Sequence, residues 1–157
     1  GAADKHSHEM PGSNSRMDTL QAAVLNLKLP LLKKWNEERR KAASFYDHAL
    51  IDIPLVLPKT TEENTHVFHV YQVQTDNRDA LKAWLKDQGV QTQIHYPKAL
   101  PFTKAYESFG HQPTTFPIAH RIQEQTLSLP LYPGLTQAEQ EHVIKSIHSF
   151  YKKEPAQ

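Results

Sequence analysis

The sequence predicts a small α+β domain, in which a sheet of about three strands is covered by helices and a long or kinked helix lies near the N-terminus. Segments 16–52 and 136–151 carry apolar residues at intervals of three and four, which is typical of helices packed on a core. Segments 66–75 and 90–95 alternate apolar and polar residues, as half-buried strands do. The 157 residues suffice for one domain with a hydrophobic core.

The N-terminal part is expected to change from extended chain to helix. Residues 1–14 are polar and contain proline and glycine, so we expect an extended lead segment there. Ser15 and Asp18 have the spacing of a capping box, which predicts a helix start. Pro30 lies inside the helical pattern and lacks an N–H group, so it predicts a kink or the start of a second helix.

The rest of the chain alternates predicted strands and helices. After the first strand, Asn77 can cap a helix that Gly89 should end in the left-handed conformation. Thr136 and Glu139 form a second capping box in front of the terminal helix. Between these helices we expect the strand 90–95, two short helices near 103–109 and 117–124, and a short third strand at 126–129.

Composition excludes several classes of function. The formal net charge of +1 leaves no basic excess for binding a nucleic acid backbone, and no apolar run approaches the ~20 residues of a membrane span. The chain has no cysteine, so disulfides and thiolate metal sites are excluded, and we expect a cytoplasmic protein. His66 and His69 would lie on opposite faces of a strand, so we predict no metal site, although ten histidines make a metal analysis a simple check.

Six short motifs in order identify a resemblance that covers roughly residues 5–151. They are Gly12-Ser-Asn-Ser-Arg-Met-Asp18 with its lead-in Lys5-x-x-His8, Leu20-Gln-Ala-Ala23, Trp35-Asn-x-x-Arg39, His66-Val-Phe-His-Val-Tyr71, His95-Tyr-Pro97 and Leu127-Ser-Leu-Pro-Leu-Tyr-Pro133. Together they resemble the DegT/DnrJ/EryC1/StrS aminotransferases, whose first motif reads G-x-N-x-R-M.

The resemblance implies a fold and an activity. Members are homodimers of fold type I that use pyridoxal 5′-phosphate (PLP) and move an amino group, usually from glutamate, onto a keto nucleotide-sugar. Residues 15–152 would be the small C-terminal domain of such an enzyme and 153–157 a tail. The large PLP-binding domain would lie upstream, and the start at Gly1 without a methionine leads us to expect a fragment.

The resemblance also implies roles for four residues. Asn14 matches the asparagine that reaches the cofactor phosphate of the partner subunit, and an amide N–H₂ donates well to phosphate oxygens. Arg16 matches an arginine placed to meet anionic groups of the substrate, which a guanidinium can bind through two parallel bonds. His95 and Tyr96 end a strand before a proline-rich loop, and they would contact the nucleotide-sugar. We expect His66, His69 and Tyr71 to be mainly structural.

No catalytic residue is predicted in this chain. The lysine that forms the Schiff base with PLP lies upstream of the matched motifs in the family, so we expect the chain alone to be inactive and to lack PLP. Two alternatives remain open. Some relatives replace this lysine with histidine and dehydrate sugars, and the C-terminal motifs do not separate the two chemistries. A non-catalytic binding module with the same fold is the other alternative.

Overall fold

A computed structural model describes residues 16–153 of the chain. The contacts divide the chain into two compact units, the first ending at Lys33 and the second beginning at Lys34. The predicted lead segment 1–14 and most of the predicted tail lie outside the described residues.

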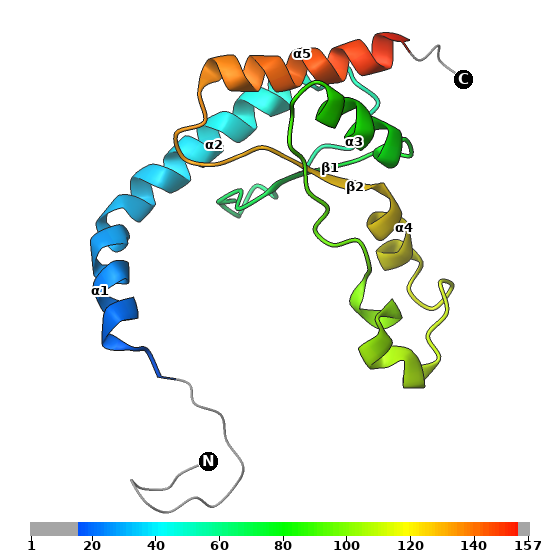
Figure 1. The fold of residues 1–157 in the computed structure, drawn as a ribbon, viewed down its shortest axis with the longest axis horizontal. Coiled ribbons are helices and arrows are strands. Elements are labelled where there is room, and N and C mark those ends of the chain that lie inside the picture. Colours follow the sequence, from blue (N-terminus) through cyan, green and yellow to red (C-terminus); the bar gives the residue numbers. More distant parts are fainter. Residues whose placement is uncertain (1–15, 154–157) are drawn as a thin grey trace, which may run out of the picture. The chain divides into compact units, whose positions relative to one another are not determined.

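The first unit is helical, as the periodic pattern predicts. Helix α1 (Thr19–Lys28) is followed by the 3₁₀ helix η1 (Leu29–Leu31), and α2 (Leu32–Ala49) continues into the second unit (Figure 1). Pro30 therefore separates two helices, which confirms one of the two forms predicted for this segment.

The start of α1 differs from the prediction. The N-cap is Asp18, whose backbone N–H donates to Gln21 Oε1 at 3.3 Å, so the helix begins at Thr19 and not near Ser15. Asp18 and Gln21 are themselves three residues apart, and this pair satisfies the free N–H groups of the first turn. Large apolar side chains of α1 are solvent-exposed, with Leu20 and Leu27 each 78% accessible.

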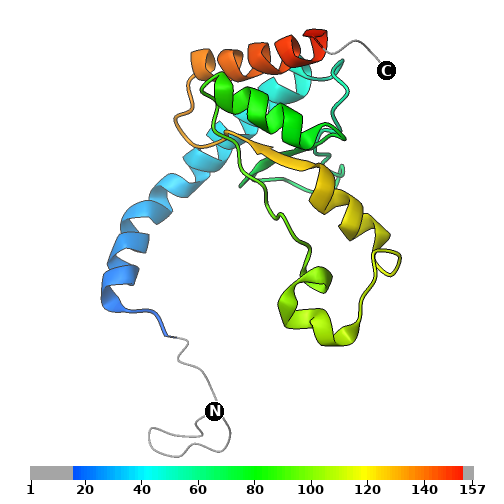
Figure 2. The same ribbon diagram turned by 45° about the vertical axis from the view of Figure 1, so that its right-hand side comes forward.

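The second unit is built on a short antiparallel pair of strands. Strand β1 (Tyr71–Gln74) pairs with β2 (Thr126–Leu129) in a register that places Tyr71 opposite Leu129. Helices α2, α3 (Arg78–Asp87) and α5 (Gln137–Lys153) pack with these strands around one core (Figure 2). The largest fully buried side chains of the core are Tyr46, Tyr71, Leu50, Leu81, Leu85, Leu127, Ile147 and Val73.

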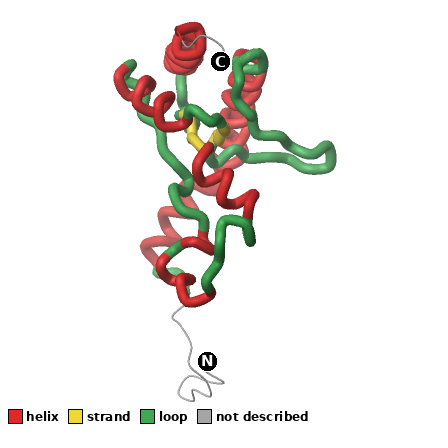
Figure 3. The backbone as a smooth tube through the Cα atoms, turned by 90° about the vertical axis from the view of Figure 1, so that its right-hand side faces the viewer, coloured by secondary structure: helices red, strands yellow, loops and turns green. Residues whose placement is uncertain are grey.

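The predicted three-stranded sheet is not confirmed, since the described residues form two strands (Figure 3). The predicted strand 90–95 pairs with β2 only through one bridge, between Gln93 and Ser128. On the other edge of the sheet, Val56 forms a single bridge with Gln74. Each neighbour therefore contributes one pair of backbone hydrogen bonds, which is too little for a regular strand.

The predicted strand 66–75 is also shorter than expected. Its first half is a tight turn, in which Phe68 has a positive φ of 48° and its N–H donates to His66 Nδ1 at 2.8 Å. The guanidinium of Arg39 donates to the carbonyls of Phe68 and His69, which replaces the bonds that a sheet neighbour would make.

The connections agree more closely with the predictions. Gly89 is left-handed with φ 79° after α3, and Thr136 and Glu139 form the predicted box before α5. Asn77 is the N-cap residue of α3, which confirms the predicted position, although its side chain makes no capping hydrogen bond. The two predicted short helices are present as η3 (Lys104–Phe109) and α4 (Pro117–Gln125), and η2 (Leu100–Phe102) is an additional 3₁₀ helix that was not predicted.

Candidate functional site

The candidate site lies where the chain leaves the edge of the sheet. Gln93 forms the bridge to Ser128 of β2, and His95 and Tyr96 follow directly. From there the chain runs through η2 and η3 and returns to the sheet through α4, which leads straight into β2. The sheet edge thus fixes the start of this excursion, defined here as residues 94–125 between the bridge at Gln93 and the start of β2, and α4 fixes its end.

Two side chains of the sheet hold His95 in place. Gln72 of β1 donates from Nε2 to the carbonyl of His95 at 2.6 Å, and His95 Nδ1 lies 2.9 Å from Ser128 Oγ. Ser128 is buried in β2, so its hydroxyl is a fixed partner for the imidazole. Because this bond engages Nδ1, the other ring nitrogen, Nε2, is the one available to a ligand.

Tyr96 presents its ring to solvent beside a groove. The residue is 74% exposed, its ring lies edge-on to that of His95, and the peptide bond between the two is cis. The groove has a volume of about 590 Å³ between residues 96–100 and α4, and its walls are mostly apolar. They are formed by Tyr96, Lys98, Ala99, Leu100, Ala119, Ile122 and Gln123. A phenol at the mouth of an apolar groove can stack on a ring and still donate a hydrogen bond.

A second cavity of about 610 Å³ lies within the same excursion and is more polar. Lys98 and Gln123 line both this cavity and the groove beside Tyr96, so they form the boundary between the two. The second cavity adds the ionisable side chains of Lys104, Glu107, His111 and His120, and the ring of Phe102 packs edge-on against His120.

Of the other predicted site residues, only Arg16 is described. It is exposed, lies two residues before the N-cap Asp18 of α1, and lines a shallow apolar surface hollow together with Met17 and Leu20. Asn14 lies outside the described residues. Arg16 belongs to the first unit and the His95–Tyr96 pair to the second, so the two parts of the predicted site are each described by themselves.

Of the three residues expected to be structural, Tyr71 lies in the core, whereas His66 and His69 are exposed. Tyr71 is fully buried and donates to Asp47 Oδ1 at 2.6 Å, while Tyr46, also fully buried, donates to the carbonyl of Pro130 at 3.0 Å. Burial raises the pKa of both phenols well above the ordinary value, and for Tyr71 the carboxylate of Asp47 raises the pKa further. Both rings therefore stay protonated at neutral pH and serve as hydrogen-bond donors within the fold.

Sequence reasoning missed Gln72 and Gln123 as partners of the candidate site. Gln72 alternates with buried residues along a strand, which marks it only as facing away from the core. Ser128 stands inside a recognised motif, but nothing in the motif shows that its hydroxyl meets His95. Among residues 16–153, no group of three or more potential ligands lies close enough to hold a metal ion, and none of the helices is long and apolar enough to cross a membrane.

Comparisons with known proteins agree with this reading of the motifs. The DegT/DnrJ/EryC1/StrS aminotransferase family matches residues 1–148. A "Pleiotropic regulatory protein" of Geobacillus stearothermophilus is 38% identical over 97% of this chain and 42% of its own length. A dTDP-3-amino-3,6-dideoxy-alpha-D-galactopyranose transaminase of Aneurinibacillus thermoaerophilus is 35% identical over 96% of this chain and 41% of its own length.

A solved structure shows the same fold at high similarity. The S. venezuelae protein DesV, in complex with a ketimine intermediate, superposes with a TM-score of 0.92 at 34% identity and covers 99% of this chain. The match takes in 42% of the DesV chain, so the present chain spans about two fifths of the length of these relatives. The family match extends over nearly the whole chain, and the chain belongs to the DegT/DnrJ/EryC1/StrS aminotransferase family.

Proposed function

We propose that this chain supplies substrate-binding residues of a PLP-dependent aminotransferase that transfers an amino group, from glutamate, to a keto nucleotide-sugar. The observation that carries the proposal is the His95–Tyr96 pair, which is fixed to the sheet through Ser128 and opens beside a groove of about 590 Å³. The family match, and relatives named as sugar transaminases, support this reading of the pair.

Each proposed substrate residue has a role that its chemistry suits. The exposed ring of Tyr96 can pack against an apolar face of the ligand while its hydroxyl donates a hydrogen bond. His95 can meet the ligand through Nε2, because Nδ1 is engaged by Ser128. Arg16, exposed at the start of α1, suits the diphosphate, which a guanidinium can bind with two parallel hydrogen bonds.

The proposed cofactor contact from this chain is Asn14, whose amide suits a phosphate oxygen and which lies outside the described residues. PLP, when bound, supplies the electron sink that amino transfer needs. The residues described here bind and orient the sugar substrate in this proposal. The lysine that carries PLP is not among the matched motifs, so we expect this chain alone to form no covalent adduct with PLP.

The proposal includes a homodimer in the cytoplasm. The apolar side chains that α1 leaves exposed, such as Leu20 and Leu27, favour association over a free monomer. Size-exclusion chromatography with light scattering tests this point. A sharp monomer peak across a range of concentrations would contradict the association.

The first test of the substrate site compares two exposed tyrosines. We expect NMR titration with dTDP-glucose to shift the signals of His95 and Tyr96, because these residues would contact the ligand. Tyr96→Ala should weaken binding by about tenfold, which corresponds to the loss of one well-placed aromatic contact. Tyr106→Ala is the matched control, since Tyr106 is exposed on η3 and lines only the other cavity. Equal effects of the two variants would contradict the assignment.

The reaction itself is tested on the protein encoded by the complete gene. We expect glutamate-dependent amination of a keto nucleotide-sugar and a borohydride-reduced PLP adduct on a lysine of the upstream PLP-binding domain, not on Lys5. Bound PLP without such an adduct, together with a dehydrated sugar product, would favour the dehydratase alternative. Absence of both PLP binding and nucleotide-sugar binding would favour the non-catalytic module.

A further inference from the structure

The loop that carries His95 and Tyr96 is held at its far end by one buried side chain. Gln123 of α4 accepts a hydrogen bond at Oε1 from the backbone N–H of Ala99, at 2.8 Å. Gln123 is only 9% exposed, and its Nε2 donates to Glu124 Oε1 at 3.0 Å. The donor side of the amide is thus occupied, and its oxygen is left to hold the loop.

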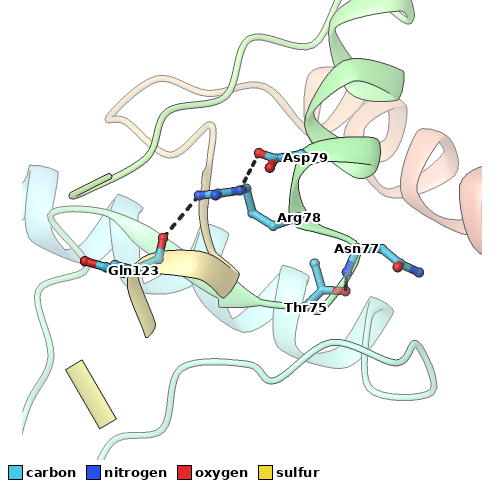
Figure 4. Close-up of polar contacts among 5 residues, drawn as sticks. All are labelled: Thr75, Asn77, Arg78, Asp79 and Gln123. Carbon is cyan, nitrogen blue, oxygen red and sulfur yellow. Dashed lines mark hydrogen bonds and ion pairs between the residues drawn. The ribbon is translucent and has the colours of Figure 1, made fainter. Parts of the chain in front are cut away.

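Gln123 is itself hydrogen-bonded to helix α3. Its backbone carbonyl accepts from Nη1 of Arg78, at 3.3 Å, at the first residue of α3 (Figure 4). The guanidinium of Arg78 is buried, and its Nε lies 2.6 Å from Asp79 in an ion pair whose geometry makes no hydrogen bond. A continuous series of polar contacts therefore runs from α3 through Gln123 to Ala99.

The position of Gln123 also gives it a direct relation to the candidate site. It forms part of the wall of the groove that Tyr96 and Lys98 border, and it lines the neighbouring cavity as well. The loop is then fixed at two points, His95 by Gln72 and Ser128 of the sheet and Ala99 by α4. Tyr96 lies between these two points, and within residues 16–153 its exposed hydroxyl makes no hydrogen bond.

We infer that Gln123 is a positioning residue: its side-chain oxygen fixes the loop 95–99 on α4 and so holds Tyr96 at the mouth of the groove. The role of Tyr96 in substrate binding is taken from the proposed function, whereas the hold on the loop rests on the contacts alone. A partly buried hydrogen bond of this kind lowers the equilibrium constant for opening of the segment it fixes by a factor of about three to ten.

The experiment measures amide hydrogen exchange and ligand binding in the same variants of the 157-residue chain. Gln123→Leu keeps the approximate volume but removes the acceptor. The double variant Gln123→Glu with Glu124→Gln exchanges the two side chains, so position 123 keeps an oxygen for Ala99 and position 124 supplies the amide donor. Gln125→Leu is the matched control, because Gln125 lies two residues further along α4 and donates to Asp76 instead of the loop. Exchange at core amides such as Leu127 reports whether a variant has lost stability as a whole.

We expect Gln123→Leu to raise the exchange rate of the Ala99 amide about three- to tenfold relative to core amides, and to weaken dTDP-glucose binding by a similar factor. The double variant Gln123→Glu with Glu124→Gln should keep most of the protection, and Gln125→Leu should leave Ala99 unchanged. Unchanged exchange in Gln123→Leu, or equal exchange in the two leucine variants, would overturn the inference. Faster exchange with unchanged binding would overturn its link to the ligand.

The two proposals fail in distinguishable ways. If the wild-type chain binds no dTDP-glucose, the proposed substrate site is contradicted, whereas the exchange rate of Ala99 still decides whether Gln123 holds the loop. If the wild type binds the ligand and Ala99 exchanges equally fast in all variants, the substrate site is supported and the positioning role is lost.

Discussion

Arg39 offers the sharpest test of how the second unit is held together. Its Nη1 lies 3.2 Å from the carbonyl of Phe68, 3.1 Å from that of His69 and 3.1 Å from that of Leu131. One nitrogen with two hydrogens serves three acceptors, so at most two full hydrogen bonds are present. Bonds from a charged donor contribute about 1.5–3 kcal/mol each when well buried. Partial solvent access at His69 reduces this, and we expect Arg39→Met to destabilise the unit by about 2 kcal/mol.

A neighbouring arginine provides the matched control. Arg40 pairs with Glu37 at 2.6 Å on the surface, where such pairs contribute less than about 1 kcal/mol, so Arg40→Met should cost at most ~0.5 kcal/mol. Urea unfolding at neutral pH measures both variants, with an unchanged slope showing that the same surface is exposed on unfolding. Arg39→Lys should recover only part of the loss, because the lysine side chain is one bond shorter and its more strongly hydrated ammonium costs more to bury beside the carbonyls. Equal stability of the two methionine variants would refute the reasoning.

Three further predictions test the core, its titration and a helix cap. Ile147→Ala removes a fully buried side chain of α5 and should lower the free energy of unfolding by about 2–5 kcal/mol in urea titrations. Burial raises the pKa values of Tyr46 and Tyr71, so both stay protonated in the folded chain, while in the unfolded chain they ionise near pH 10. The free energy of unfolding should therefore fall above that pH, by up to about 1.4 kcal/mol per pH unit for each tyrosine. Tyr46→Phe should make this fall with pH less steep in unfolding curves. Hydrogen bonds from Thr136 lower the pKa of Glu139. The cap of α5 therefore contributes stability above the ordinary carboxyl pKa, and this stability is lost as the pH falls through the lowered value. Thr136→Ala should raise the pKa of Glu139 in an NMR titration, and an unchanged pKa would contradict the cap.

The parts of the fold that could be predicted from the sequence are those fixed by neighbours along the chain. The box of Thr136 and Glu139, the left-handed Gly89 and the helix break at Pro30 each depend on residues within a turn of one another. The strand at 126–129 contains two leucines and is followed by Pro130, so its position could also be predicted from the sequence.

The parts that could not be predicted depend on partners far away in the sequence. Alternation over 66–75 favours one long strand, yet Arg39, about thirty residues upstream, satisfies the carbonyls of Phe68 and His69 and permits a turn instead. Likewise, the pattern of 90–95 suits a strand, and it reaches β2 only through the bridge at Gln93. A local pattern gives the preference of a segment, and tertiary hydrogen bonds decide whether a sheet neighbour is needed.

The same distinction applies to the candidate site. The motif residues His95 and Tyr96 were identified by resemblance, but the side chains that fix them, Gln72, Ser128 and Gln123, lie on three other elements. Ser128 belongs to a second recognised motif, so two motifs about thirty residues apart meet in one hydrogen bond. An exposed ring such as that of Tyr96 can bind a ligand with little loss of entropy only if the backbone beneath it is already ordered. The partly buried contacts that Gln72, Ser128 and Gln123 make with the loop 95–99 meet this requirement, which makes the loop a preformed part of the proposed substrate site.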